Sequence, residues 1–386
     1  MQCIAMQCVA MQANRFSSAI DFTCQTAVNI IHCFSKVRPM DFHAHQTKAE
    51  SKSLEFVLYF FLAIAGTACV LWVPLLLLPE MPKHPLGRWL LSPSAFMWCF
   101  TISLIIIGIS SLQKSRQLER AGGKFVAYAC GASPVGAPAD AQEQMLAEIV
   151  AELSSACKIK PPELYVIRHE PGINAFVAGH GEADTVMAVT RGALDDLTRD
   201  ELKGVAAHEF SHITNGDMRL CTQLIAIICG VSSLSMFGRY VGMLGGLGRI
   251  FGLFLICGGM FGSVCAHAMQ SSISRQRELL ADACAVRATG SATGLAGALK
   301  KIAASSAGST LSGDSASYFN HLMLSDCRGY RSNEWWVITS IKQTIFTLFA
   351  SHPPLGERIR VLDPAFDGDL SQFAKPKKTE GDAPLQ

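Results

Sequence analysis

Four long segments without a charged residue limit what this chain can fold into more than any other feature of its sequence. They cover residues 56–78, 89–112, 220–238 and 250–274. A helix needs about 20 apolar residues to cross the hydrocarbon core of a bilayer. Only 17% of the 386 residues are charged and the mean hydropathy is +0.27, which is unusual for a soluble protein. The sequence therefore predicts an integral membrane protein with up to four transmembrane helices and contact with a lipid bilayer.

Basic residues near these segments predict their orientation. Lysine and arginine are enriched in the cytoplasmic loops of membrane proteins. Lys48 and Lys52 precede the first segment, and Lys83 and Arg88 lie between the first and the second. Four more follow the second segment, at Lys114, Arg116, Arg120 and Lys124. We therefore expect a multi-pass protein of the cell (inner) membrane, with the N-terminus and everything after residue 113 on the cytoplasmic side. The segments 220–238 and 250–274 are less apolar, and the sequence leaves open whether they span fully or pack partly on protein.

The remaining sequence predicts an α+β fold that is mainly helical. Helices are expected at 140–157, 198–214, 271–289, 296–304 and 355–362, and strands at 164–168, 173–178 and 185–190. These elements and the apolar segments divide the chain into six parts. An N-terminal extension (1–53) is followed by a transmembrane hairpin (54–112) and a first catalytic part (113–219). A second membrane hairpin (220–270), a second catalytic part (271–366) and a polar tail (367–386) follow. The extension begins with a near-repeat, and translation starting at Met40 is one hypothesis.

Charge and cysteine usage exclude some classes of function. The formal net charge is +2, so nothing indicates a nucleic-acid partner. The 14 cysteines are scattered, and they form no CxxC pair. They are typical of small buried side chains in a reducing compartment, and they predict neither a disulfide framework nor a thiolate zinc site.

An HExxH motif predicts a metal site. His208 and His212 are four residues apart, so a helix presents both imidazoles on one face, and Glu209 lies beside the first. Thr198 and Glu201 have the spacing of a capping box, which supports a helix that starts there. The alternative is a helix that carries two surface histidines by chance, but the apolar neighbours of the motif make that costly.

Two histidines leave a zinc site incomplete, because a catalytic zinc usually has three protein ligands and a water. Glu278 and Asp282 lie four apart in a predicted helix, RELLAD. We predict Glu278 as the third ligand and Asp282 as a carboxylate that orients a ligand histidine through its other ring nitrogen. The alternative is an ordinary pair of surface carboxylates.

Several stretches resemble one family. PGINAFVAG, VTRGALDDLTRDELKGVAAHEFSHITNGDM, SRQRELLADACAV and HPPLGERI occur in the order found in the HtpX-like membrane zinc metalloproteases, which are distantly related to the prenyl-protein (CAAX) proteases. The resemblance covers roughly residues 40–365. It implies a zincin domain of the gluzincin type with a small mixed or antiparallel sheet, and one Zn²⁺ per chain held by His208, His212 and Glu278. It also implies Glu209 as the general base.

Two further assignments depend mainly on this resemblance. Asn174, Ala175 and Phe176 match an edge strand to which a substrate peptide could add as another strand. The alternative is a covered strand of the core. His352 and Arg358 match residues near the site that could stabilise an oxyanion. Their alternative role is structural, capping the short helix or pairing with a carboxylate.

The function expected from these features is that of a metalloendopeptidase in the membrane. Its substrates would be proteins or peptides, and the family suggests misfolded or damaged membrane proteins cut on the cytoplasmic side. The sequence leaves two alternatives open: a processing protease dedicated to one substrate, and a zinc-bound scaffold or chaperone without proteolytic activity. The sequence predicts neither the cleavage preference nor the oligomeric state.

Overall fold

The computed structural model describes residues 92–181, 183–305, 307–311, 322–325 and 349–373. The chain divides into two units, 1–55 and 56–386, and all described residues belong to the second. The predicted segment 56–78, the N-terminal extension with Met40 and the polar tail after residue 373 lie outside the described residues.

The long helix α4, Pro93–Ala129, contains most of the second apolar segment. The sequence placed a boundary at residue 112, but the helix continues beyond it because residues 113–121 include neither glycine nor proline. There the backbone has φ 67°, and the helix bends. Gly123 allows the close approach that follows, since a Cβ there would lie 2.4 Å from the carbonyl oxygen of Ala178. The kink therefore lets the end of α4 pack on the sheet.

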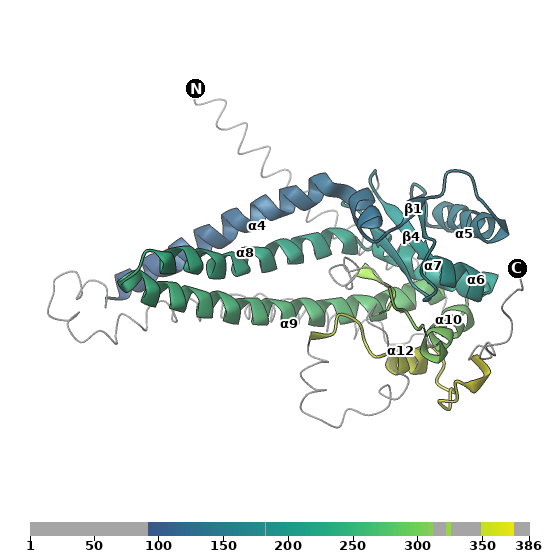
Figure 1. Cartoon of the computed structure of the whole chain (residues 1–386). Helices are drawn as coiled ribbons and strands as arrows, with labels where there is room; N and C mark the ends of the chain where they lie inside the picture. Colours follow the sequence, from purple (N-terminus) through teal and green to yellow (C-terminus); the bar gives the residue numbers. More distant parts are fainter. Residues whose placement is uncertain (1–91, 182, 306, 312–321, 326–348, 374–386) are drawn as a thin grey trace, which may run out of the picture. The chain divides into compact units, whose positions relative to one another are not determined.

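Two further long helices run side by side, α8 at Asp217–Met243 and α9 at Leu247–Thr289 (Figure 1). They approach closely at Gly238 and Gly252, where an added Cβ would lie 2.7 and 2.5 Å from the other residue's carbonyl oxygen. The predicted segment 250–274 and the predicted helix 271–289 are one continuous helix. It ends at Gly290, whose φ of 74° few other residues adopt.

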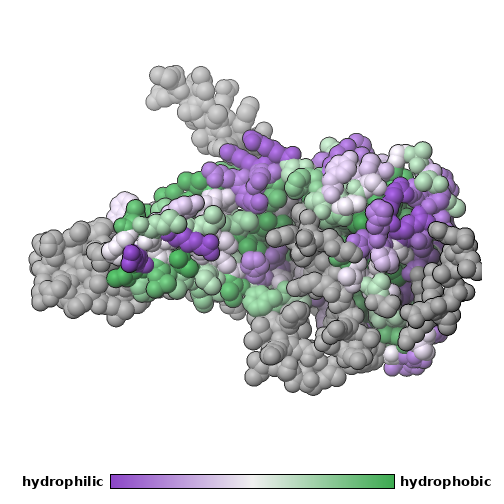
Figure 2. Space-filling view, in the orientation of Figure 1, coloured by the Kyte–Doolittle hydropathy of each residue, from purple (hydrophilic) through white to green (hydrophobic). Residues whose placement is uncertain are grey.

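Both helices are long and apolar enough to cross a membrane, and they are the two such helices among the described residues. Only 28% of the apolar stretch in each is buried, so neither resembles the core helix of a soluble protein. Figure 2 shows much of the surface over the long helices in green, the colour of apolar residues. Exposed apolar side chains on α4, α8 and α9 include Ile105, Ile109, Met236, Leu253 and Phe261.

A four-stranded mixed sheet forms the centre of the compact region. Its order is β1-β2-β4-β3, with strands at Ser133–Pro134, Glu163–Ile167, Val186–Thr190 and Ala175–Ala178. β2 and β4 are parallel, while β1 and β3 are antiparallel to their neighbours. The predicted small mixed sheet is therefore present, with the short strand β1 in addition.

Both faces of the sheet are buried, which explains why its strands are continuously apolar. Val177, Met187 and Val189 face the main core with α5 (Ala141–Cys157) and α7 (Arg199–Thr214). The alternate residues of the same strands pack against the end of α4 and against Met323. The short helix α6, Arg191–Asp196, connects β4 to α7.

The remaining helices enclose α7, which carries the HExxH motif. α10, Thr293–Ala304, packs on α7 so closely that a Cβ at Gly204 would lie 2.6 Å from the backbone nitrogen of Leu295. α12, Leu355–Leu362, packs on α10 and α9, and a 3-10 turn, Ser371–Phe373, follows. Burial of α7 between these elements places its polar residues in the interior, where they need partners.

Candidate metal centre and active site

The two histidines of α7 meet as the motif predicts. Thr198 and Glu201 form the expected capping box, so α7 begins at Arg199 and its residues 208 and 212 share one face. The two rings lie edge to face with centroids 4.9 Å apart, and their Nε2 atoms are 3.3 Å apart. Two nitrogens each about 2.0–2.1 Å from one tetrahedral zinc would be about 3.3–3.4 Å apart. The pair therefore has the spacing of two ligands to a single ion.

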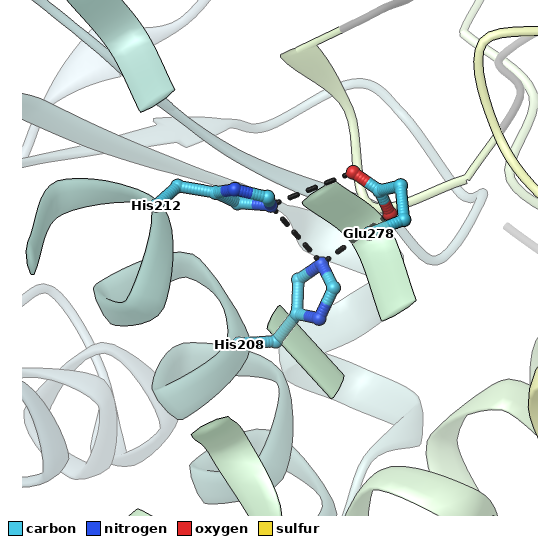
Figure 3. A group of neighbouring side chains, drawn as sticks. All are labelled: His208, His212 and Glu278. Atoms are coloured by element: carbon cyan, nitrogen blue, oxygen red, sulfur yellow. Dashed lines mark hydrogen bonds and ion pairs between the residues drawn. The ribbon is translucent and has the colours of Figure 1, made fainter. Parts of the chain in front are cut away.

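Glu278 on α9 completes the group (Figure 3). Its Oε2 lies 3.5 Å from Nε2 of His208, and its Oε1 lies 3.5 Å from Nε2 of His212. The three candidate ligand atoms all lie within 4.8 Å of one another. Seventy residues of sequence, including all of α8 and most of α9, separate Glu278 from His208, yet the fold brings them to one point. The set of two imidazoles and one carboxylate fits zinc.

Each histidine is oriented by its own carboxylate. Nδ1 of His208 lies 2.9 Å from Oδ1 of Asp282, the residue that the sequence predicted for this position. Nδ1 of His212 lies 2.8 Å from Oδ2 of Asp217, which the sequence analysis missed. Asp217 begins α8 directly after Gly216, whose φ is 70°. The sequence offered one signal for this contact, because Asp217 lies five residues after His212. The turn between α7 and α8 is what directs the carboxylate of Asp217 back toward His212.

Arg358 on α12 lies at the site but has no exposed surface. Its guanidinium donates to both carboxylate oxygens of Asp282, at 2.8 and 2.7 Å, and to the carbonyl oxygen of Leu324 at 2.7 Å. The nitrogen that donates to Leu324, Nη1, also lies 3.3 Å from Oε2 of Glu278. This arrangement matches the alternative that the sequence left open, in which Arg358 pairs with a carboxylate. A guanidinium so occupied has little capacity left for a substrate oxyanion.

His352, by contrast, reaches the candidate ligand set directly. Its Nδ1 lies 3.3 Å from Oε2 of Glu278, and the residue is 7% exposed. The two prolines that follow it lead into α12, so the ring is placed by the same short helix that carries Arg358. The geometry therefore brings His352 next to Glu278.

Glu209 is a buried carboxylate without a hydrogen-bond partner for either oxygen among the described residues. Burial raises the pKa of Glu209, although the nearby His208 and His212 act in the opposite direction. Burial also disfavours the charged form of His208, but hydrogen bonds to Asp282 and Glu278 outweigh it and raise the pKa of His208 to about 9. An unpaired buried carboxylate is costly, and a bound cation with its water would satisfy it.

Asn174, Ala175 and Phe176 are buried at the outer edge of the sheet. The Asn174 amide nitrogen donates to the carbonyl oxygens of Ser309 and Ser325, at 2.9 and 3.2 Å. The backbone nitrogen of Leu324 donates to the carbonyl oxygen of Ala175 at 2.9 Å, and Phe176 pairs with Met323. The free edge predicted at these residues is therefore already occupied by the chain itself, which corresponds to the covered strand left open as the alternative.

Comparison with known proteins agrees with this site. The model of peptidase family M48 matches residues 140–365, so the chain belongs to that family of metalloproteases. The "Protease HtpX homolog" of Dictyoglomus turgidum is 33% identical over 244 residues, which cover 60% of this chain and 72% of the relative. The homologues from Streptococcus uberis (30% over 228 residues) and Limosilactobacillus reuteri (31% over 242) cover 55% and 60% of this chain and 71% and 76% of theirs. The protein is accordingly an HtpX-like membrane metalloprotease.

Proposed function

We propose that this protein is an integral membrane zinc endopeptidase, with one Zn²⁺ per chain held by His208, His212 and Glu278 and with Glu209 as general base. The observation that carries the proposal is the position of Glu209. Its carboxylate is buried, has no hydrogen-bond partner among the described residues, and follows directly on His208 in α7. A carboxylate in this setting can accept a proton without first giving up another bond.

Bound zinc would supply Lewis acidity, which lowers the pKa of water to about 7 and polarises the substrate carbonyl. Glu209 takes one proton from the water while the oxygen of that water attacks the carbonyl carbon of the substrate. It then returns that proton to the amide nitrogen as the peptide bond breaks. The raised pKa of Glu209 in the metal-free protein suits this exchange, because a base whose pKa is nearer to neutral can also act as the acid.

The other site residues take supporting roles in this proposal. His352 lies at the edge of the ligand set, 3.3 Å from Glu278, where its ring can donate a hydrogen bond to the oxyanion. Asp282 and Asp217 hold the two ligand histidines in the orientation that turns both Nε2 atoms toward the metal. Arg358 keeps Asp282 charged and in place, and so acts through it on His208.

The membrane arrangement that we propose has up to four spans, with the gluzincin-type catalytic part on the cytoplasmic side. It is supported by the basic residues that follow the second apolar segment and by the two candidate spans α8 and α9. We propose misfolded or damaged membrane proteins as substrates. Reporter fusions test the topology: a fusion after residue 373 should report the cytoplasm, and one in the α8–α9 connection should report the opposite side.

The enzyme itself is tested with purified protein, an unstructured protein substrate and metal analysis. Wild type should contain about one zinc per chain and cleave the substrate until a chelator is added. Glu209→Gln should retain the zinc and lose cleavage by about a thousandfold or more. Glu148→Gln, an exposed carboxamide substitution on α5, is the matched control and should cleave like wild type. Cleavage retained by Glu209→Gln would refute the role of this residue, and zinc without any cleavage by wild type would favour a scaffold.

A further inference from the structure

A pocket lies directly beside the candidate metal ligands, between the start of α8 and the part of α9 that precedes Glu278. His212 and Glu278 are among its lining residues, so it is continuous with the metal centre. On α8 it is lined by Asp217, Cys221 and Leu224, whose spacing of four and three places them on one helical face. At 1.5 Å per residue, this face extends the pocket by about 10 Å along α8, away from the metal ligands.

The wall formed by α9 has the same periodicity. Gln270, Ile273 and Arg277 line the pocket at spacings of three and four, on the side of the helix that also presents Glu278. Val177 of β3 and Leu322 close the pocket from the sheet side. The space between these walls is open at its mouth and measures about 520 Å³ when the solvent there is included.

The chemistry of this lining is mainly apolar. Its two charged groups beyond the metal ligands, Asp217 and Arg277, are paired with each other, so they present no uncompensated charge. Met218 and Leu224 are buried at 7% and 8% exposure and form the apolar wall on α8. A pocket with such walls favours an apolar group, since burial removes apolar surface from water.

We propose that this pocket binds an apolar side chain, such as leucine, of the substrate residue next to the cleaved bond. The proposal rests on the proposed protease function. An extended chain advances by about 3.3–3.6 Å per residue. If the carbonyl of the cleaved bond lies at His212 and Glu278, the side chain of an adjacent residue therefore reaches the pocket. Because the walls belong to the two candidate membrane spans, the substrate class is extended segments rich in apolar residues, as membrane proteins expose when they leave lipid.

Two peptides that differ only by leucine or alanine at the flanking position test this pocket. The position is first identified by mass spectrometry of the cleavage sites that the purified full chain makes in an unstructured protein. Wild type should cleave the leucine peptide about tenfold more efficiently than the alanine peptide. In Leu224→Trp, which fills the pocket, the ratio should fall toward one. Leu253→Trp, on the exposed side of α9, is the matched control and should keep the wild-type ratio.

A binding measurement separates this proposal from the protease function on which it rests. The zinc-loaded Glu209→Gln protein should bind the leucine peptide about tenfold more tightly than the alanine peptide, by fluorescence anisotropy. Adding Leu224→Trp should remove that difference. If Leu224→Trp does not fold, Leu224→Ala should extend the preference to tryptophan. A ratio unchanged in the Leu224 variants, or equal binding of both peptides, would overturn the pocket assignment. Absence of cleavage with selective binding intact would refute only the protease function.

Discussion

His208 and His212 lie one turn apart on the same helix, yet the regions that support them differ. Behind His208 the support is the packed interior: Asp282 is 2% exposed and is held on both oxygens by Arg358, which has no exposed surface. Behind His212 the support is the start of α8, where Asp217 pairs with an Arg277 whose side chain is 30% exposed. One candidate ligand is therefore supported by the core, and the other by the beginning of a candidate membrane span.

This difference indicates which of the two supports is easier to displace. Displacing Asp282 would require repacking α9 against α12, whereas a small shift of α8 would move Asp217 directly. Water can also partly replace the partly exposed Arg277, whereas water does not reach the buried guanidinium of Arg358. We therefore expect large effects from changes behind His208 and smaller ones from changes behind His212.

The largest effect should come from Arg358→Met. This change leaves Asp282 and Glu278 in the interior without their shared cation, and losing one partner of a buried ion pair costs about 3–5 kcal/mol. Denaturant unfolding of the detergent-solubilised protein should show a lower free energy of unfolding by that amount. Arg360→Met, on the exposed side of the same helix, should stay within about 0.5 kcal/mol of wild type. A loss below about 1 kcal/mol for Arg358→Met would show that the buried pairing is dispensable.

Asp282→Asn should weaken zinc binding by about a hundredfold. The amide keeps an oxygen acceptor, but it loses the charge that fixes the tautomer of His208, and partners of this kind are worth about 10–100-fold in metal affinity. Competition with a chromophoric chelator measures the affinity. Asp200→Asn, an exposed change in the first turn of α7, is the control and should bind zinc like wild type. Equal affinities for the two variants would contradict the role of Asp282.

Asp217→Asn should weaken zinc binding by only about tenfold, at the lower end of the same range. The effect is smaller because the carboxylate lies at the start of α8 next to a partly exposed arginine. Arg277→Met should weaken binding in the same direction, since it releases Asp217. If Asp217→Asn cost as much as Asp282→Asn under the same assay, the proposed contrast between the two supports would be wrong.

Zinc affinity should also depend on pH, and the change for each half unit should be smaller than the effect of either asparagine variant. In the metal-free protein Asp282 and Glu278 raise the pKa of His208 to about 9, so below that pH the ring carries a proton that zinc must displace. The apparent affinity should therefore weaken by about threefold for each half unit that the pH falls below about 9. The raised pKa also stabilises the metal-free fold at low pH, and this contribution is lost as the pH rises through about 9.

Proton release on adding zinc to a weakly buffered solution checks this linkage. About one proton per zinc from His208 is expected at pH 7.5, and the release should decline as the pH approaches and passes 9. In Asp282→Asn the decline should begin at lower pH, because the carboxylate that raises the pKa of His208 is gone. Zinc affinity that does not change between pH 7 and 8.5 would contradict the prediction.

The sequence alone determined the local parts of this protein. The capping box of Thr198 and Glu201, the shared face of His208 and His212 and the end of α9 at Gly290 each depend on residues within a few positions of one another. Helical periodicity and the φ preference of glycine act over that range, so the pattern is sufficient. Glu278 and Asp282 could be predicted although they lie about 70 residues from the HExxH motif. A zinc site needs a third protein ligand, and a ligand histidine needs a carboxylate that orients it.

Contacts between residues that are far apart in the sequence depend instead on how the whole chain folds. Arg358 faces Asp282 across 76 residues, and Asn174 bonds to Ser325 across 151, so Arg358 lies behind the candidate metal ligands and the edge of β3 is covered at Ala175 and Phe176. Asp217 turns back to His212 because α8 starts at that point in space. No spacing rule encodes these contacts, since each results from how buried helices pack and from the need of every buried charge for a partner.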